Sequence, residues 1–109
     1  MHVETHTRAF SLTAGLKDFL RRRIEFALGR YRDGIRRVVV RLRGRPAGRT
    51  GVASECLLEV ELASRTRLVI SDADPDLYRA ITRATRRADH QVARRLARKP
   101  ARETLPHFV

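Results

Sequence analysis

Apolar residues recur along the chain with two periods, and each change of period marks an element. From residue 14 to about residue 32 they return every three or four positions, which predicts a helix. Thr13 precedes this segment and is a good N-cap. Asp33-Gly34 follows it, with Gly34 available for a left-handed C-cap. The predicted apolar stripe contains Leu16, Phe19, Leu20, Ile24, Ala27, Leu28 and Tyr31.

Other segments alternate between apolar and polar side chains, as half-buried strands do. Residues 2–7 alternate weakly, and residues 35–43, 53–62 and 66–71 alternate clearly. We expect the inward residues to be Val38, Val40, Leu42, Cys56, Leu58, Val60 and Leu62, and the outward ones to be Arg37, Val39, Arg41, Arg43, Glu55, Glu59 and Glu61. Residues 44–51, GRPAGRTG, are predicted to form a Gly/Pro loop, and residues 63–65 a tight turn.

A second helix is predicted over residues 74–99, with Asp74 as its cap and Pro75 at its first position. At about 100° per residue its two sides differ sharply. The apolar stripe contains Leu77, Ile81, Ala84, Thr85, Ala88 and Val92, and the opposite side carries Arg79, Arg83, Arg86, Arg87, His90, Arg94 and Arg98. Within the helix only Asp76 and Asp89 oppose this charge, and like charges one turn apart repel.

The predicted order is therefore β-α-β-β-β-α, which indicates an α+β two-layer sandwich with two helices on one face of a four-stranded sheet. We assign residues 1–99 to one domain and residues 100–109, which contain two prolines, to a flexible tail. Arg95 and Lys99 fall on the apolar side of the second helix. Its last turn is therefore expected to project past the sheet.

The charge balance of the chain indicates an anionic partner. The 109 residues include 24 Lys+Arg against 12 Asp+Glu, for a net charge of +12, and nearly all the basic residues are Arg. The guanidinium fork suits phosphate, so the composition points first to nucleic acid and second to an anionic membrane surface. Genome composition is the alternative source of the arginines, but it would not sort them onto one side of a helix.

Localisation follows from what the chain lacks. No apolar run is long enough to span a membrane, and the first ten residues contain no signal-peptide core. A single cysteine cannot form an internal disulfide, which agrees with a reducing compartment. We expect a cytoplasmic protein without membrane contact.

Two stretches suggest ligand binding only superficially. The loop at 44–51 has Arg49 where a phosphate-binding loop has Lys, and a strand follows it instead of a helix. Either it is a basic loop that touches a phosphate chain or it is a plain hairpin loop. His2 and His6 share a strand face but lie about 13 Å apart at ~3.3 Å per residue, too far to share a metal ion.

The remaining candidates also have structural explanations. Asp72, Asp74 and Asp76 lack the Gly and Glu of a calcium loop, and helix capping accounts for the last two. Cys56 lies on an inward strand face and fits a core residue better than a nucleophile. His90 lies among arginines and is expected to contact RNA or solvent. We therefore expect no metal, no cofactor, no small-molecule substrate and no enzymatic activity.

The first helix contributes further basic residues. Arg23 falls inside its apolar stripe, so its charge must reach out of the core or meet a partner. Lys17, Arg21, Arg22 and Arg32 lie on the other side, mixed with Asp18 and Glu25. This helix is less one-sidedly basic than the second.

Three segments resemble the ribosome hibernation-promoting factors, the family of ribosome-associated inhibitor A, also called protein Y. TAGLKDF at residues 13–19, with a basic residue at 23, resembles the family's T-x-A-L-R-x-[FY] segment. VVVRL resembles its second strand, and DLYRAI at 76–81 resembles the D-x-Y-x-A-I-D that opens its second helix. Gly15 and Thr82 depart from the usual Ala and Asp, and the usual Gly of the first strand is absent. The resemblance covers about residues 1–99, as in a short form or N-terminal domain, and the fold is similar to double-stranded-RNA-binding domains.

The resemblance implies a translation inhibitor that binds small-subunit rRNA near the decoding centre and occludes the mRNA and tRNA channel in stress or stationary phase. By position, Arg23, Arg87 and Arg94 match basic residues of the family. The helical wheel adds Arg79, Arg83, Arg86 and Arg98, and the predicted rRNA-binding set is completed by His90, Lys17 and Arg22. The expected partner is the small ribosomal subunit, and the free protein is expected to be monomeric. A general RNA-binding domain and a protein-binding transcription modulator remain alternatives.

Overall fold

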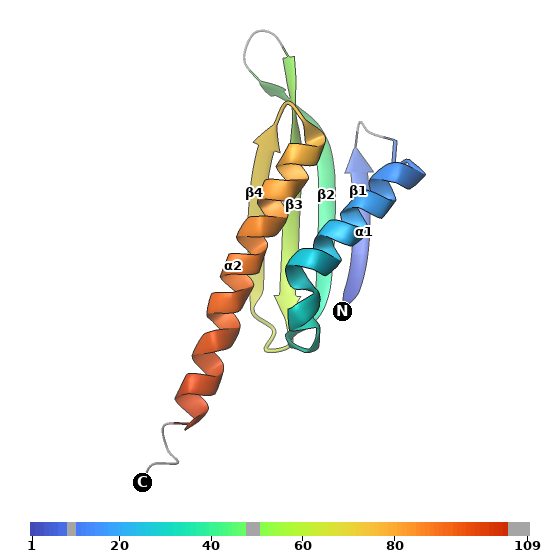
Figure 1. The fold of residues 1–109 in the computed structure, drawn as a ribbon. Helices are drawn as coiled ribbons and strands as arrows, with labels where there is room; N and C mark the ends of the chain where they lie inside the picture. Colours follow the sequence, from blue (N-terminus) through green and yellow to red (C-terminus); the bar gives the residue numbers. More distant parts are fainter. Residues whose placement is uncertain (9–10, 48–50, 105–109) are drawn as a thin grey trace.

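The computed structural model describes the backbone of residues 1–8, 11–47 and 51–104, and the side chains of residues 1–8, 11–44 and 53–97. Its elements are β1 (His2–Arg8), α1 (Ala14–Leu28), the 3-10 helix η1 (Gly29–Gly34), β2 (Ile35–Ala47), β3 (Gly51–Leu62), β4 (Arg67–Asp74) and α2 (Leu77–Thr104). The two helices contact each other and lie on one face of a single four-stranded sheet (Figure 1). The predicted α+β two-layer sandwich is thus confirmed.

The sheet has the strand order β1-β2-β3-β4. β1 runs parallel to β2, whereas β2–β3 and β3–β4 are antiparallel. A parallel pair needs a crossover connection, and α1 with η1 supplies it. Figure 1 shows the result: α1 lies over the β1–β2 side, and α2 packs along β3 and β4.

The core lies between the helices and the sheet, and it is made of the predicted inward positions. The buried strand residues include Val38, Val40, Leu42, Cys56, Leu58, Val60 and Ile70, and the helices add Leu16, Leu20, Ile24, Ile81, Ala84, Thr85, Ala88 and Val92. The alanines at 80, 84 and 88 present a small-residue strip, which allows α2 to approach the sheet closely. Burying each Leu, Ile or Val contributes about 1.5–3 kcal/mol, so this shared core fixes both helices on the sheet.

The predicted loop over residues 44–51 is wrong at both ends. β2 and β3 continue as a hairpin through this segment, with Gly44 opposite Ser54 and Ala47 opposite Gly51, and the pairs after the first of these extend beyond β1 and β4 (Figure 1). Pro46 is tolerated because β1 ends opposite Arg43, which leaves this part of β2 with a free edge. The remaining residues of that loop, 48–50, lie outside the described residues, and its contact with phosphate stays a prediction.

The first helix begins as predicted and ends earlier. The Leu16 N–H donates to Thr13 Oγ1 at 3.1 Å, which confirms the N-cap. The helix ends at Leu28 because Gly29 weakens it, and the chain tightens into η1. The predicted left-handed cap at Gly34 is wrong. A Cβ on Gly34 would lie 2.9 Å from Leu96 Cδ1, so the absence of a side chain at residue 34 leaves room for Leu96 of α2.

The predicted cap of the second helix is also wrong. Asp74 still belongs to β4, where it pairs with Ser54, because a residue before proline prefers extended backbone. Asp76 is the N-cap: its Oδ1 accepts the Tyr78 N–H at 2.9 Å and its carbonyl accepts the Ala80 N–H at 3.1 Å. Pro75 therefore precedes the helix, and Asp74 Oδ1 instead accepts the Asp76 N–H.

The C-terminal end of α2, beyond Leu96, projects past the sheet, as predicted for the last turn (Figure 1). The predicted helix end at residue 99 is wrong, since α2 continues through Pro100 to Thr104. A proline removes one i→i−4 hydrogen bond while its neighbours keep theirs. The flexibility of the last five residues lies outside the described residues. In the part of the chain that is described, no helix is both long and apolar enough to cross a membrane.

Candidate nucleic-acid interface

The outer side of α2 carries arginines whose charge is not neutralised. Arg79, Arg86 and Arg94 are exposed, and none has a carboxylate partner among the described residues. His90 lies exposed on the same side. Their positions follow from the helical period, because the buried Ile81, Ala84, Ala88 and Val92 face the sheet and leave this side to solvent.

Arg83 and Arg87 differ from these residues because β4 neutralises them. Arg83 donates to Asp72 Oδ1 at 2.8 Å and to the Ala73 carbonyl at 3.0 Å, and its Nη2 lies 3.3 Å from Asp74 Oδ2. The hydrogen bond with Asp72 raises the pKa of Arg83. Arg87 donates to the Ser71 carbonyl at 2.7 Å and lies 3.7 Å from Asp72. Both therefore clamp α2 to β4, with less charge left for a partner.

Asp89 was expected to offset the charge of the arginines of α2, but it pairs with residues of η1 instead. Its carboxylate accepts from Arg30 at 2.9 Å and from the Tyr31 hydroxyl at 2.8 Å. Burial raises the pKa of Tyr31, and the hydrogen bond to Asp89 raises it further. Since Asp76 is the N-cap, neither acid compensates Arg86 or Arg94.

Arg23 lies between the two helices and meets a neutral partner. Its Nη2 donates to Thr85 Oγ1 at 3.2 Å, and its buried Nε has no hydrogen-bond partner among the described residues. Its guanidinium lies over the Phe26 ring, 5.3 Å from the centroid. The expectation that this charge meets a partner is confirmed, but the partner leaves it positive. The buried Nε is out of reach of a partner, but Arg23 remains a half-buried cation, which attracts an approaching anion.

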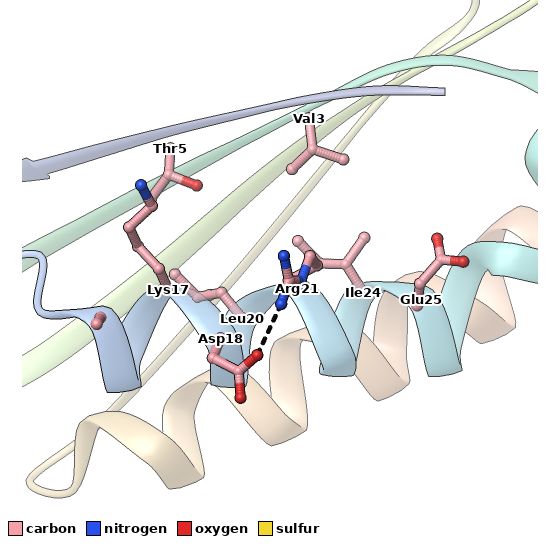
Figure 2. Close-up of a pocket in the computed structure, with 9 residues that line it drawn as sticks. Val3, Thr5, Lys17, Asp18, Leu20, Arg21, Ile24 and Glu25 are labelled. Atoms are coloured by element: carbon pink, nitrogen blue, oxygen red, sulfur yellow. Dashed lines mark hydrogen bonds and ion pairs between the residues drawn. The ribbon is translucent and has the colours of Figure 1, made fainter.

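The remaining predicted residues divide between two sides of α1. Arg22 is exposed and lies 3.2 Å from Asp18, which also bonds Arg21 at 2.8 Å. Lys17 instead lines a groove toward β1 (Figure 2), so the structure does not bring it together with the arginines of α2. The side chain of Arg98 lies outside the described residues.

The groove between α1 and β1, which the sequence did not indicate, has a volume of about 410 Å³. Val3, Leu20 and Ile24 give it an apolar floor, and the charged side chains along its rim are Lys17, Asp18, Arg21 and Glu25 (Figure 2). It exists because α1 does not fully cover the edge strand, where Val3 remains 39% exposed. The two cations and two anions offset each other, so the groove offers no strong attraction for a polyanion.

On the open face of the sheet three arginines are paired with glutamates, whereas Arg67 is exposed and has no carboxylate partner among the described residues. Arg41 donates to Glu59 at 2.9 Å, Arg43 pairs with Glu55, and Arg37 lies 3.4 Å from Glu4. Three arginines of the open face are therefore neutralised, whereas Arg79, Arg86 and Arg94 of α2 are not. Helical periodicity predicted which arginines face outward, but not which of them had acidic partners on other elements.

The structure adds one residue to the helical surface that the sequence analysis did not select. Phe26 of α1 is 75% exposed, although it is a large aromatic residue. Its absence from the apolar stripe of the helical wheel was the signal that could have identified it. By contrast, Phe19 meets Tyr78 edge-to-face at 4.8 Å and joins the two helices.

The groups considered for metal binding and covalent chemistry have other roles in the structure. Glu4, between His2 and His6, is paired with Arg37. Burial raises the pKa of Cys56 to about 12, so the thiol stays protonated at neutral pH and fills the core. Among the described residues, no group of three or more His, Cys, Asp or Glu side chains could hold a metal ion.

Comparisons with known proteins place this fold. No curated protein matches the sequence significantly. Among solved structures, the N-terminal domain of protein Y from Thermus thermophilus is similar, with 28% identity, a TM-score of 0.71, and coverage of 86% of this chain and 98% of that one. A ribosomal subunit interface protein from Coxiella burnetii has a TM-score of 0.74 over 89% of this chain and 99% of its own, and at 12% identity it shows the fold alone.

The sequence itself also matches a family. Residues 3–99 match the family described as sigma 54 modulation protein / S30EA ribosomal protein, and this match spans nearly all of the described domain. The resemblance found in the helix and strand motifs is thereby confirmed. The chain belongs to the sigma 54 modulation protein / S30EA ribosomal protein family.

Proposed function

We propose that this protein is a ribosome-associated translation inhibitor that acts in the cytoplasm under stress or in stationary phase. It binds the rRNA of the small subunit near the decoding centre and occludes the channel that mRNA and tRNAs share. Family membership and the likeness to a protein Y domain support a ribosome-associated role. The observation that carries the rRNA contact is the set of uncompensated arginines on α2, with Arg23 of α1 beside them, while three arginines of the open sheet face are paired.

The mechanism is occlusion by a folded domain. Arg23, Arg79, Arg86 and Arg94 pair with phosphates and release their counterions, with Arg87 and His90 at the margin of the same surface. The shape of a folded rRNA cleft, rather than reading of base edges, supplies most of the specificity. No bond is made or broken, so the protein requires no cofactor and has no catalytic activity.

Co-sedimentation with purified small subunits tests this function. Arg79→Gln/Arg86→Gln removes two uncompensated charges from α2, and Arg36→Gln/Arg67→Gln removes two exposed charges from β2 and β4 as a matched control. We expect pelleting at low salt to be lost in the first variant and kept in the second. Equal loss in both variants would show that only net charge matters, as in general RNA binding.

A second measurement separates the proposal from its alternatives. Ribosome-free duplex RNA of similar length is offered in competition with small subunits. A general RNA-binding domain would bind both equally, whereas the proposed function requires a clear preference for the subunit. A protein-binding transcription modulator would keep its partner after the Arg79→Gln/Arg86→Gln change and would not pellet with subunits at all.

A further inference from the structure

Phe26 is the most exposed of the large apolar side chains that the structure describes as exposed. Its ring is 75% accessible, compared with 57% for Val69, 47% for Tyr78 and 39% for Val3. Single exposed apolar residues are common on protein surfaces and alone indicate nothing. Phe26 differs from that common case because a charged group lies over its ring.

One cation contacts this ring on the helical surface. The Arg23 guanidinium lies over the ring, 5.3 Å from the centroid, which restrains the ring by a cation–π contact. The nearby Arg22 is 3.2 Å from Asp18, and Arg30 of η1 pairs with Asp89, so both are already partly neutralised. Phe26 is therefore an accessible aromatic surface with one cation, Arg23, in contact with its ring.

This combination fits a nucleotide better than an apolar protein surface. An apolar partner that covered the ring would also have to remove water from the exposed part of Arg23, without supplying an anion to it. A nucleotide provides both contacts at once: its flat base stacks on the ring, and its phosphate pairs with the guanidinium. Unpaired bases in folded RNA commonly stack on aromatic side chains in this way.

We propose that Phe26 is a stacking site for one unpaired nucleobase, with Arg23 bound to a neighbouring phosphate. The proposal rests on the rRNA-binding function above and deepens it, because it adds a contact with a base to a surface otherwise made of phosphate contacts. The base must be extruded from any duplex, so the site selects a loop, a bulge or a single strand.

The salt dependence of affinity distinguishes stacking from charge pairing. Phe26→Leu keeps an apolar side chain but removes the ring, and Phe26→Trp enlarges the ring. Phe26→Leu is expected to weaken binding to small subunits on the order of tenfold, while Phe26→Trp retains affinity. Stacking releases no counterions, so the slope of log K against log salt stays unchanged in both variants. A normal affinity for Phe26→Leu, or a reduced slope, would overturn the stacking role.

The chain contains no tryptophan, so Phe26→Trp also introduces a unique fluorescent reporter. We expect its emission to be quenched when small subunits bind, because a base stacks on the indole. Val69→Trp is the matched control: residue 69 is 57% exposed on β4, away from the helices, and its emission is expected to change little.

The outcomes separate this inference from the function on which it rests. If the unsubstituted protein does not bind small subunits, both are wrong. If it binds and Phe26→Trp shows no quenching beyond that of Val69→Trp, only the stacking site is wrong. Loss of affinity in Phe26→Leu without quenching in Phe26→Trp would indicate an apolar contact with a ribosomal protein, and it would equally overturn the assignment of a base.

Discussion

Arg83 and Arg86 lie three residues apart on α2, yet the same change to glutamine is expected to have opposite consequences. The Arg83 guanidinium is held by Asp72 at 2.8 Å and by Asp74 at 3.3 Å, and these carboxylates are only 14% and 11% exposed. Arg86 is exposed and has no carboxylate partner among the described residues. A phosphate can therefore use the charge of Arg86, whereas that of Arg83 is already neutralised.

The size of the effect follows from counterion release. Each phosphate contact contributes about 0.7–0.9 to the slope of log K against log salt. Arg86→Gln should reduce the magnitude of the slope by that amount. When salt rises from about 50 to 200 mM, the affinity of both proteins falls, but the loss should be about threefold smaller for Arg86→Gln than for the unsubstituted protein. Arg83→Gln should leave the slope unchanged. It should instead lower the unfolding temperature, because Asp74 then loses its cation and Asp72 keeps only Arg87, 3.7 Å away.

The assay is equilibrium binding of a fluorescently labelled protein to small subunits at four KCl concentrations, with thermal unfolding of the same preparations. Arg83→Gln is the matched control for Arg86→Gln, since both remove one positive charge from α2. An equal reduction of the slope in the two variants would refute the view that its ion pairs keep Arg83 from binding phosphate. A lower unfolding temperature for Arg86→Gln would show that Arg86 has a structural role.

Two further predictions concern the stability of the fold. Gly34→Ala places a Cβ 2.9 Å from Leu96 Cδ1, and because Leu96 is only half-buried and can turn, the cost should be about 1 kcal/mol. Urea unfolding should show that this cost disappears in a Leu96→Ala background, and additive costs would contradict the contact. Burial raises the pKa of Cys56 from 9.0 to about 12. The stability that the protonated thiol contributes is therefore complete below pH 9, and the free energy of unfolding falls by about 1.4 kcal/mol per pH unit as pH rises toward 12. Cys56→Ala should flatten this alkaline decline in the free energy of unfolding, whereas an unchanged slope would show that Cys56 does not cause it.

The periodic patterns predicted the elements because side-chain burial alternates with the geometry of each element. They could not predict where elements end, since local backbone hydrogen bonds and edges decide that. Asp74 and Asp76 are equally plausible caps in sequence, and the pairing of Asp74 with Ser54 decides between them. Pro46 suggested a loop, but it lies in β2 where β1 no longer pairs.

The candidate site was only partly predictable for a related reason. A helical wheel considers one helix alone, so it identified Arg79 and Arg86 as outward but could not show that β4 brings Asp72 to Arg83. Likewise, Asp89 seemed to oppose the arginines of α2, whereas η1 supplies its actual partner, Arg30. Knowledge of which elements are neighbours in space was needed to count the available charges.

The position of the carboxylates, more than that of the arginines, distinguishes the two faces of this protein. Both faces carry arginine, but Glu55 and Glu59 lie beside arginines of the open sheet face, and the outer side of α2 has no such acids among its described residues. Arg79, Arg86 and Arg94 lie about two turns apart along one side of α2, so their mutual repulsion is weak, and packing of the buried stripe holds the helix in place. A bound polyanion removes this repulsion. These arginines therefore gain favourable contacts only in the complex, which gives a physical reason for their lack of carboxylate partners in the free protein.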